Sequence, residues 1–173
     1  MPKVNLNIDI EDLRWSAEIP AIETVAENTK NALINYMSDH ADIEIFESNR
    51  DISVNLCLSD DAHIRTLNRT FRGKDKPTNV LSFANMDFTD FAAQNNLYND
   101  IELGDIIMAY ETTRQEAETE HITLHDHFCH LLVHGILHLL GYDHIEADEA
   151  EIMEGYEISV LQTLNIANPY EEE

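Results

Sequence analysis

The chain has 173 residues, of which 34 are acidic and 10 are lysine or arginine, so its formal net charge is −24. Length and a hydrophobic content of 43% predict one folded domain over residues 1–173, ending in an acidic tail at 165–173, and exclude a mini-protein or a disordered chain. Such an excess of carboxylates repels polyanions and argues against a general nucleic-acid or anionic-membrane binder.

The two cysteines, Cys57 and Cys129, lie in apolar periodic segments. This placement argues against a disulfide framework, and the sequence has no Cys-x-x-Cys metal motif. The first residues lack an apolar run of signal-peptide length, and nowhere do eighteen consecutive apolar residues occur. We therefore expect a soluble protein of the reducing cytoplasm that does not associate with membranes.

Alternating apolar residues at positions 4–10 predict a first strand. Apolar spacings of three, four and seven then predict an amphipathic helix from about 19 to 36. Alternation returns at 43–45 and at 52–58, on either side of the polar residues 48–51. This pattern predicts a hairpin.

Ser59 is the expected N-cap of a helix that runs to about residue 71, because its hydroxyl can accept from a free amide of the first turn. Short strands are expected at 80–83 and 106–108. The polar stretch 87–100 between them has no clear period, so we expect a long loop there with a functional or mobile role.

Helices are expected at about 111–120, 124–140 and 147–164. Strands therefore come mainly early in the chain and helices late. This order predicts an α+β domain in which helices cover a small mixed β-sheet.

Seven of the nine histidines lie between residues 121 and 144. His134 and His138 are four apart in an apolar helical segment, so their rings project from one face and can bind one ion. Gly141 can adopt a positive φ that ends the helix and turns the chain back, which brings His144 in as a third ligand. Three neutral imidazoles leave one position of a tetrahedral zinc open for water, as in catalytic zinc sites.

The alternative, a helix whose histidines only pack or face solvent, does not account for the glycine between the second and third ligands. His127 and His130 share the helix face of His134, but we expect them to donate hydrogen bonds or fill that face rather than bind metal. Metzincin proteases use the same ligand spacing with a glutamate base after the first histidine. Here that residue is Gly135, so a peptidase would lack its base.

Half of all basic residues lie in the segment 65–76, which has a net charge of +4. One interpretation is an anion-binding patch, because the planar guanidinium of arginine suits phosphate oxygens. The other is a helix terminus whose cations complement the helix dipole and acidic neighbours. The segment alone does not separate these two interpretations.

Three motifs of this chain resemble the YbeY family of bacterial metal-dependent endoribonucleases, also called rRNA maturation factors. They are HGILHLLGYDH at 134–144, the segment from Leu67-Asn68 through FRGKDKPTNVLSF at 71–83, and Leu103-Gly104-Asp105. Together they span about residues 67–144. Ala84 stands where the family often has proline after Leu-Ser-Phe.

The resemblance implies a zincin-like α+β fold with one Zn²⁺ ion on His134, His138 and His144. It also implies that Arg72 is the catalytic arginine, so Arg72 and His134 are the catalytic candidates, with no organic cofactor. The implied substrate is single-stranded RNA, with roles in rRNA maturation, including the 3′ end of the small-subunit rRNA, and in ribosome quality control.

Two other functions stay open: a zinc peptidase that lacks the usual glutamate, and a noncatalytic zinc-containing factor bound to the ribosome. The roles of Asp105 and Asp143 also stay open between the site and structural capping. The net negative charge argues against an RNA substrate. If the basic segment lies beside the metal, however, the two form a local positive cleft that can attract RNA. Such a cleft predicts weak general affinity for RNA and pronounced salt sensitivity.

Overall fold

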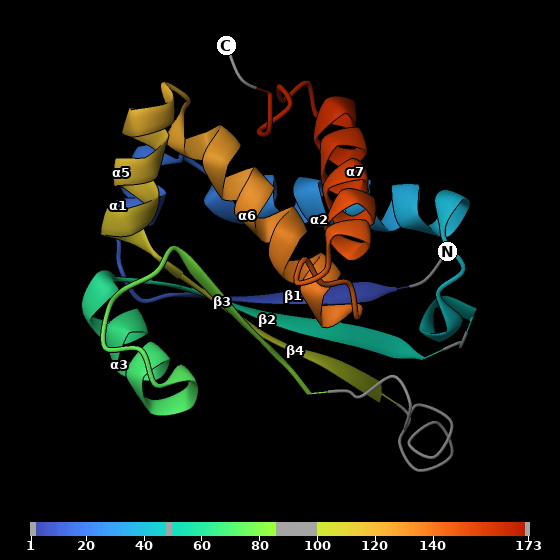
Figure 1. Cartoon of the computed structure of the whole chain (residues 1–173), viewed down its shortest axis with the longest axis horizontal. Helices are drawn as coiled ribbons and strands as arrows, with labels where there is room; N and C mark the ends of the chain where they lie inside the picture. The colour runs from blue at the N-terminus through green and yellow to red at the C-terminus, as the bar shows by residue number, and fades with distance from the viewer. Residues whose placement is uncertain (1–2, 48–49, 86–99, 172–173) are drawn as a thin grey trace.

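The computed structural model describes residues 3–47, 50–85 and 100–171. Within these ranges the strands are β1 (Val4–Ile10), β2 (Asp51–Ser59), β3 (Val80–Ala84) and β4 (Asp100–Ala109). The α-helices are α1 (Arg14–Glu18), α2 (Ile22–His40), α3 (Asp61–Arg72), α5 (Tyr110–Glu120), α6 (Leu124–Leu139) and α7 (Ala147–Thr163), and a 3₁₀-helix, η1, covers Glu44–Glu47 (Figure 1).

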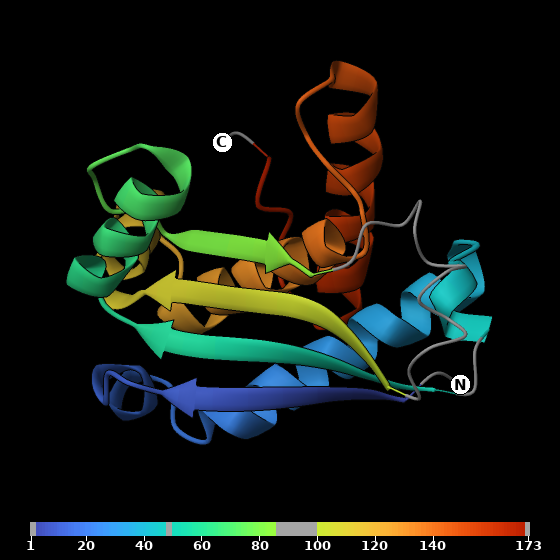
Figure 2. The same ribbon diagram turned by 90° about the horizontal axis from the view of Figure 1, so that it is seen from below.

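The four strands form one mixed sheet in the order β1-β2-β4-β3. β1, β2 and β4 are parallel, whereas β3 runs antiparallel to β4, as the arrows in Figure 2 show. The expected α+β class with a small mixed sheet is therefore confirmed. The two outer strands, β1 and β3, lie at opposite edges of the sheet.

The predicted hairpin is wrong. β1 and β2 are joined through α2, and β2 pairs in parallel with both of its neighbours. The apolar pair Ile43 and Ile45 brackets the start of η1, and Ile45 is fully buried. The alternation of Ile43 and Ile45 therefore reflects packing into the core. A period of two shows which side of the chain is buried, but it does not show which strands pair with each other.

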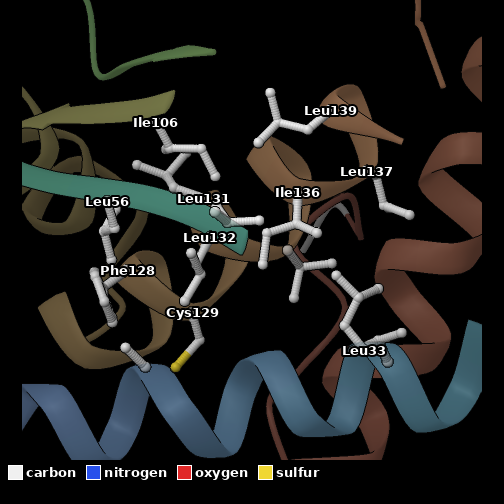
Figure 3. Packing of buried hydrophobic residues seen from close by; sticks show 14 of the residues in the cluster. Leu33, Leu56, Ile106, Phe128, Cys129, Leu131, Leu132, Ile136, Leu137 and Leu139 are labelled. Carbon is white, nitrogen blue, oxygen red and sulfur yellow. The ribbon is translucent and has the colours of Figure 1, made fainter. Parts of the chain in front are cut away.

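One face of the sheet carries the main hydrophobic core (Figure 3). Leu56 and Ile106 project from β2 and β4 onto α6, and Ile136 of α6 is completely buried at this contact. On its other side α6 packs on α2, where Leu33 is also fully buried. The helix that carries the paired histidines is thus held between the sheet and a second helix.

The opposite face of the sheet is covered at one end by α3, where Ile64 and Ile107 form a small second cluster. A row of polar side chains crosses the same face farther along the strands. Asn7 donates to Asn55 at 3.1 Å, and Asn55 donates to Asp105 at 2.9 Å. Asp105 therefore belongs to the sheet face turned away from α6.

Several element boundaries differ from the expected ones. Helix α1 was not expected; it is anchored by Trp15, whose buried indole N–H donates to the carbonyl of Ser59 at 2.9 Å. Ser59 is the last residue of β2, and Asp60 caps α3 by accepting from the amide of His63. β4 begins at Asp100 rather than near 106, and residues 87–99 of the loop expected at 87–100 lie outside the described residues.

Across the described ranges, every helix is too short or too polar to cross a lipid bilayer.

Candidate metal centre and cleft

The three predicted ligands come together at the C-terminal end of α6. His134 and His138 lie one turn apart on one face of the helix, with their Nε2 atoms 3.1 Å apart. His144 follows the helix, and the ligand atoms of all three rings lie within 4.8 Å of one another. The spacing of the three histidines in the sequence therefore correctly predicted that their side chains lie close together.

Gly141 makes this arrangement possible by ending the helix. Its φ of 104° lies in the region that side chains rarely adopt, and its amide donates to the carbonyl of His138 at 3.0 Å. The next residue, Tyr142, turns back toward the helix, and its carbonyl lies 3.0 Å from Nδ1 of His138. The reversed chain therefore both positions His144 and orients His138.

His134 is oriented by a carboxylate. Its Nδ1 lies 3.3 Å from each oxygen of Glu157, a fully buried side chain of α7. An imidazole that donates from Nδ1 presents an unprotonated Nε2, which is the form that binds metal. His138 is held in the same way by the carbonyl of Tyr142, so the lone pairs of both Nε2 atoms face one another.

These lone pairs provide a test of whether the site fits a cation. Two unprotonated nitrogens only 3.1 Å apart repel each other unless a positive ion lies between them. Nitrogens bound to one tetrahedral zinc lie about 3.4 Å apart, as follows from Zn–N bonds of about 2.05 Å. Burial, reinforced by the neighbouring imidazoles, lowers the pKa of His138 to about 4, so this ring is neutral at pH 7. The residues present therefore fit a divalent ion.

Glu157 was missed by the sequence analysis. Its Oε1 accepts from Nε2 of His130 at 2.7 Å and from the hydroxyl of Tyr170 at 2.9 Å. Burial alone would raise the pKa of Glu157, but the hydrogen bonds from His130 and His134 outweigh it and leave the pKa at about 2. The available signal was a glutamate on the apolar helix face that also carries Met153 and Val160.

The other two histidines on this face of α6 lie outside the group of three ligand atoms. His130 donates to Glu157, as described above, and Nε2 of His127 lies 2.8 Å from a carboxylate oxygen of Glu116. The same carboxylate accepts from the side-chain amide of Asn79 at 2.9 Å. Both rings thus hold carboxylates in place, and the expectation that they are not ligands stays a prediction.

Arg72 lies on the same cleft as the three histidines. The cleft has a volume of about 690 Å³, and its lining includes Arg72, Lys74, Ser82 and the three histidines. Arg72 is the last residue of α3, and Gly73 ends that helix with a φ of 69°. The guanidinium donates to the carbonyl of Ser82 at 3.1 Å and lies over the ring of Phe83, with 5.5 Å from Cζ to the ring centroid. It is therefore tied to β3.

The remaining cations of the basic segment divide into two groups. Arg65 and Arg69 lie 2.9 and 3.8 Å from the carboxylate of Asp75, so their charges are partly neutralised. Lys76, in contrast, lines a second groove of about 510 Å³ together with Arg72 and Lys74. The two interpretations of the basic segment therefore each describe part of it.

Asp143 also lines the cleft, and one of its oxygens accepts from the backbone amide of His144 at 2.7 Å. Asp105 lies on the opposite face of the sheet, as described above. Two aromatic residues of the motifs pack on each other: Phe71 contacts Phe83 edge-to-face, with ring centroids 5.5 Å apart.

A side chain at position 135 would not point into the cleft. A Cβ placed on it would come within 3.0 Å of Cδ1 of Ile106 in β4. The residue after the first histidine therefore faces the sheet, where a glutamate side chain has no room.

Comparison with known proteins decides the family. A family model described as Endoribonuclease YbeY matches residues 16–165. The chain belongs to the YbeY family. Curated YbeY-family relatives named "Endoribonuclease YbeY" include one from Rhizobium etli, 41% identical over 171 residues, which covers 99% of this chain and 95% of the relative. Another, from Paramagnetospirillum magneticum, is 48% identical over 122 residues, covering 70% of this chain and 73% of the relative.

The fold also resembles a solved structure. The solution structure of a Thermotoga maritima protein matches with a TM-score of 0.54 and 23% identity, covering 96% of this chain and 99% of that one. At this identity the match supports the fold alone. The resemblance to the YbeY family noted from the motifs is thus confirmed over nearly the whole chain.

Proposed function

We propose that this protein is a metal-dependent endoribonuclease that cleaves single-stranded RNA in the cleft between Arg72 and the three histidines. One observation carries the proposal: Arg72, His134, His138 and His144 line a single cleft although they come from separate parts of the chain. Family membership supports the reaction class, since the curated relatives are named endoribonucleases.

In this proposal the three imidazoles hold one Zn²⁺ ion, which when bound supplies a Lewis acid for a phosphate oxygen or a water. Arg72 binds the scissile phosphate and stabilises the negative charge that develops on it. One of its N–H groups is occupied by Ser82, so the guanidinium is held in place while its other donors remain available. Glu157 keeps His134 in the form that binds metal.

The biological setting proposed is the cytoplasm, with ribosomal RNA as substrate, including the 3′ end of the small-subunit rRNA. The proposed partner is accordingly the small ribosomal subunit, and the role extends to ribosome quality control. Family membership supports this setting.

The peptidase alternative is disfavoured by Gly135, because its position faces Ile106 and offers no base to the cleft. A purely structural zinc is disfavoured by the three-histidine set. Such a set leaves a coordination position open, and the rings line a large cleft.

The experiment compares cleavage of single-stranded RNA and of casein by the purified full-length protein with a measured zinc content. For Arg72→Ala we expect RNA cleavage to fall by about 10²–10³, the loss typical of removing one donor to a developing oxyanion. His134→Ala should abolish cleavage and lower the bound zinc.

Arg65→Ala is the matched control, because this arginine pairs with Asp75 and does not line the cleft. It should cleave RNA as the wild type does. Cleavage that survives both Arg72→Ala and His134→Ala would point to a contaminating nuclease and reject the site. Hydrolysis of casein but not of RNA would favour the peptidase.

A further inference from the structure

A second group of potential ligands lies outside the histidine cleft. Glu11 follows β1, Cys57 lies in β2, and His63 lies in the first turn of α3. Sγ of Cys57 is 3.0 Å from Oε1 of Glu11, and Nδ1 of His63 is 2.9 Å from the same oxygen. One ligand atom from each residue can be chosen so that all three lie within 4.8 Å of one another.

We propose that Glu11, Cys57 and His63 form a second binding site for a divalent transition-metal ion such as Zn²⁺. Thiolate, imidazole and carboxylate are the three side-chain ligand types that zinc uses in proteins. Hard ions such as Mg²⁺ prefer oxygen ligands, so the sulfur and nitrogen favour a softer ion.

The backbone fixes where these three residues lie. In the parallel pair of β1 and β2, Asp9 stands opposite Cys57, and the amide of Glu11 continues the pairing by donating to the carbonyl of Leu58 at 2.9 Å. The amide of His63 is held by the N-cap, Asp60. The three ligands therefore come from positions that regular structure defines, which limits the ordering needed when an ion binds.

The two distances to Glu11 require only a small adjustment, and the ligand atoms of Cys57 and His63 lie within 4.8 Å of each other. Ligand atoms around one tetrahedral zinc lie about 3.3–3.5 Å apart, given Zn–O and Zn–N bonds of about 2.0 Å and Zn–S bonds of about 2.3 Å. The observed 2.9 and 3.0 Å are shorter, so the side chains must separate by about half an ångström. His63 and Glu11 are about 40% exposed and are free to make this movement.

The surroundings favour a cation and leave room for a further ligand. Cys57, His63 and Asp9 line a pocket of about 470 Å³ on this face of the sheet. The hydroxyl of Ser59 also lies 2.9 Å from Nδ1 of His63. Binding replaces the hydrogen bond from the Cys57 thiol to Glu11 by a sulfur–metal bond, and the thiol proton passes to solvent.

This site is separate from the histidine cleft. Leu56 and Leu58 project from β2 into the core beneath α6, so Cys57 between them projects from the other face, where it joins the cluster under α3. Glu11 extends β1, the edge strand opposite β3, and β3 is the strand that lines the histidine cleft (Figure 2).

Cobalt distinguishes the two sites because only one of them contains sulfur. Co²⁺ is titrated into the full-length protein after metal has been stripped, while near-ultraviolet absorption is recorded. Coordination by Cys57 gives a thiolate-to-cobalt charge-transfer band, which imidazole ligands alone cannot give. We expect the wild type to bind two equivalents of Co²⁺, one of which produces the band.

Cys57→Ser should lose the band and retain one equivalent, and His63→Gln should weaken or lose the band with the cysteine still present. Cys129→Ala is the matched control, since Cys129 is buried against Thr29 and should not affect the band. The double variant His134→Ala/His138→Ala should keep the band although the first site is destroyed. Circular dichroism verifies that each variant is folded.

A single equivalent without a charge-transfer band in the folded wild type would overturn the proposal. So would a band that persists in Cys57→Ser. Neither result depends on RNA cleavage, so this site and the proposed nuclease activity can fail independently.

Discussion

Glu157 is a carboxylate with no exposed side-chain surface in a protein of strongly negative charge. A buried carboxylate is costly unless hydrogen bonds compensate for its lost hydration. Here His130, His134 and Tyr170 donate to its two oxygens. Glu157 thus anchors the imidazole that it orients, and its removal should affect metal binding at the proposed site.

We predict that Glu157→Gln weakens metal binding by about 10–100-fold, the usual effect of removing a carboxylate that orients a ligating histidine. The neutral amide keeps the size of the side chain but cannot accept from several donors equally well. Affinity is measured by competition with a chromophoric chelator. Glu151→Gln, an exposed change in the same helix, serves as the control and should leave the affinity unchanged.

The glycines in α6 and α7 have different effects on stability. Gly135 lets α6 approach Ile106, and an added Cβ would meet three atoms of that fully buried side chain at 3.0–3.3 Å. Gly155 in α7 has nothing within 4 Å of its Cβ position. The first glycine is thus required by packing, whereas the second only lowers the helix propensity.

Gly135→Ala should therefore destabilise the protein. Overpacking costs about 1–3 kcal/mol and exceeds the gain of about 1 kcal/mol in helix propensity, so we expect a net loss of up to about 2 kcal/mol. Gly155→Ala should instead gain up to about 1 kcal/mol. Urea unfolding of both variants gives the comparison, and equal effects at the two positions would contradict this account of the contact between α6 and the sheet.

Glu116 links α5 to α6 through His127 and to the start of β3 through Asn79. Burial raises its pKa, but these hydrogen bonds outweigh burial and hold the pKa below its ordinary value of 4.5. A carboxyl group with a lowered pKa in the folded state stabilises the fold above its unfolded-state pKa. That contribution is lost as the pH falls below about 4.5.

The free energy of unfolding should accordingly fall less between pH 7 and about pH 3.5 in Glu116→Gln than in the wild type, because the variant lacks this titration. The measurement uses metal-stripped protein, so that metal release does not contribute. Glu120→Gln, an exposed change in the same helix, should follow the wild type. An identical acid response of Glu116→Gln and wild type would show that the link does not contribute.

The spacing of His134, His138 and His144 predicted their convergence because a helix turn and a glycine stop are local features. Glu157 was not found, since its partners on α6 are more than twenty residues away and its place on the apolar face of α7 does not show which groups it contacts. The hairpin prediction was wrong for a related reason. The partners of β2 are set by the crossover through α2 and by the pairing with β4, and an alternating apolar pattern carries no information about either.

At the scale of the molecule, the charge of −24 and the cationic cleft coexist because the basic residues are unevenly placed. Arg72 and Lys74 line the histidine cleft, and Lys76 lines the adjoining groove with them. If RNA is the substrate, as proposed, this charge distribution should repel it at a distance and attract it close to the cleft, and both effects should depend on ionic strength.

We predict that single-stranded RNA binding, measured on a His134→Ala background to prevent cleavage, weakens steeply with salt. Each phosphate contact contributes about 0.7 to the slope of log K against log salt, so Lys74→Ala and Lys76→Ala should each reduce the slope by about that amount. Arg69→Ala should leave it nearly unchanged, because this arginine lies beside Asp75. Equal reductions in all three variants would indicate diffuse attraction rather than a defined cleft.

The contact between Tyr170 and Glu157 also has a consequence for the order in which the residues of the candidate metal centre come together during synthesis. The three imidazoles leave the ribosome first, followed by the carboxylate that orients His134, and the hydroxyl that bonds this carboxylate comes last. A nascent chain that has just presented His144 therefore has the carbonyl that orients His138 but not yet the carboxylate that orients His134. The hydrogen bonds to this carboxylate are complete only when the segment after α7 packs against Glu157.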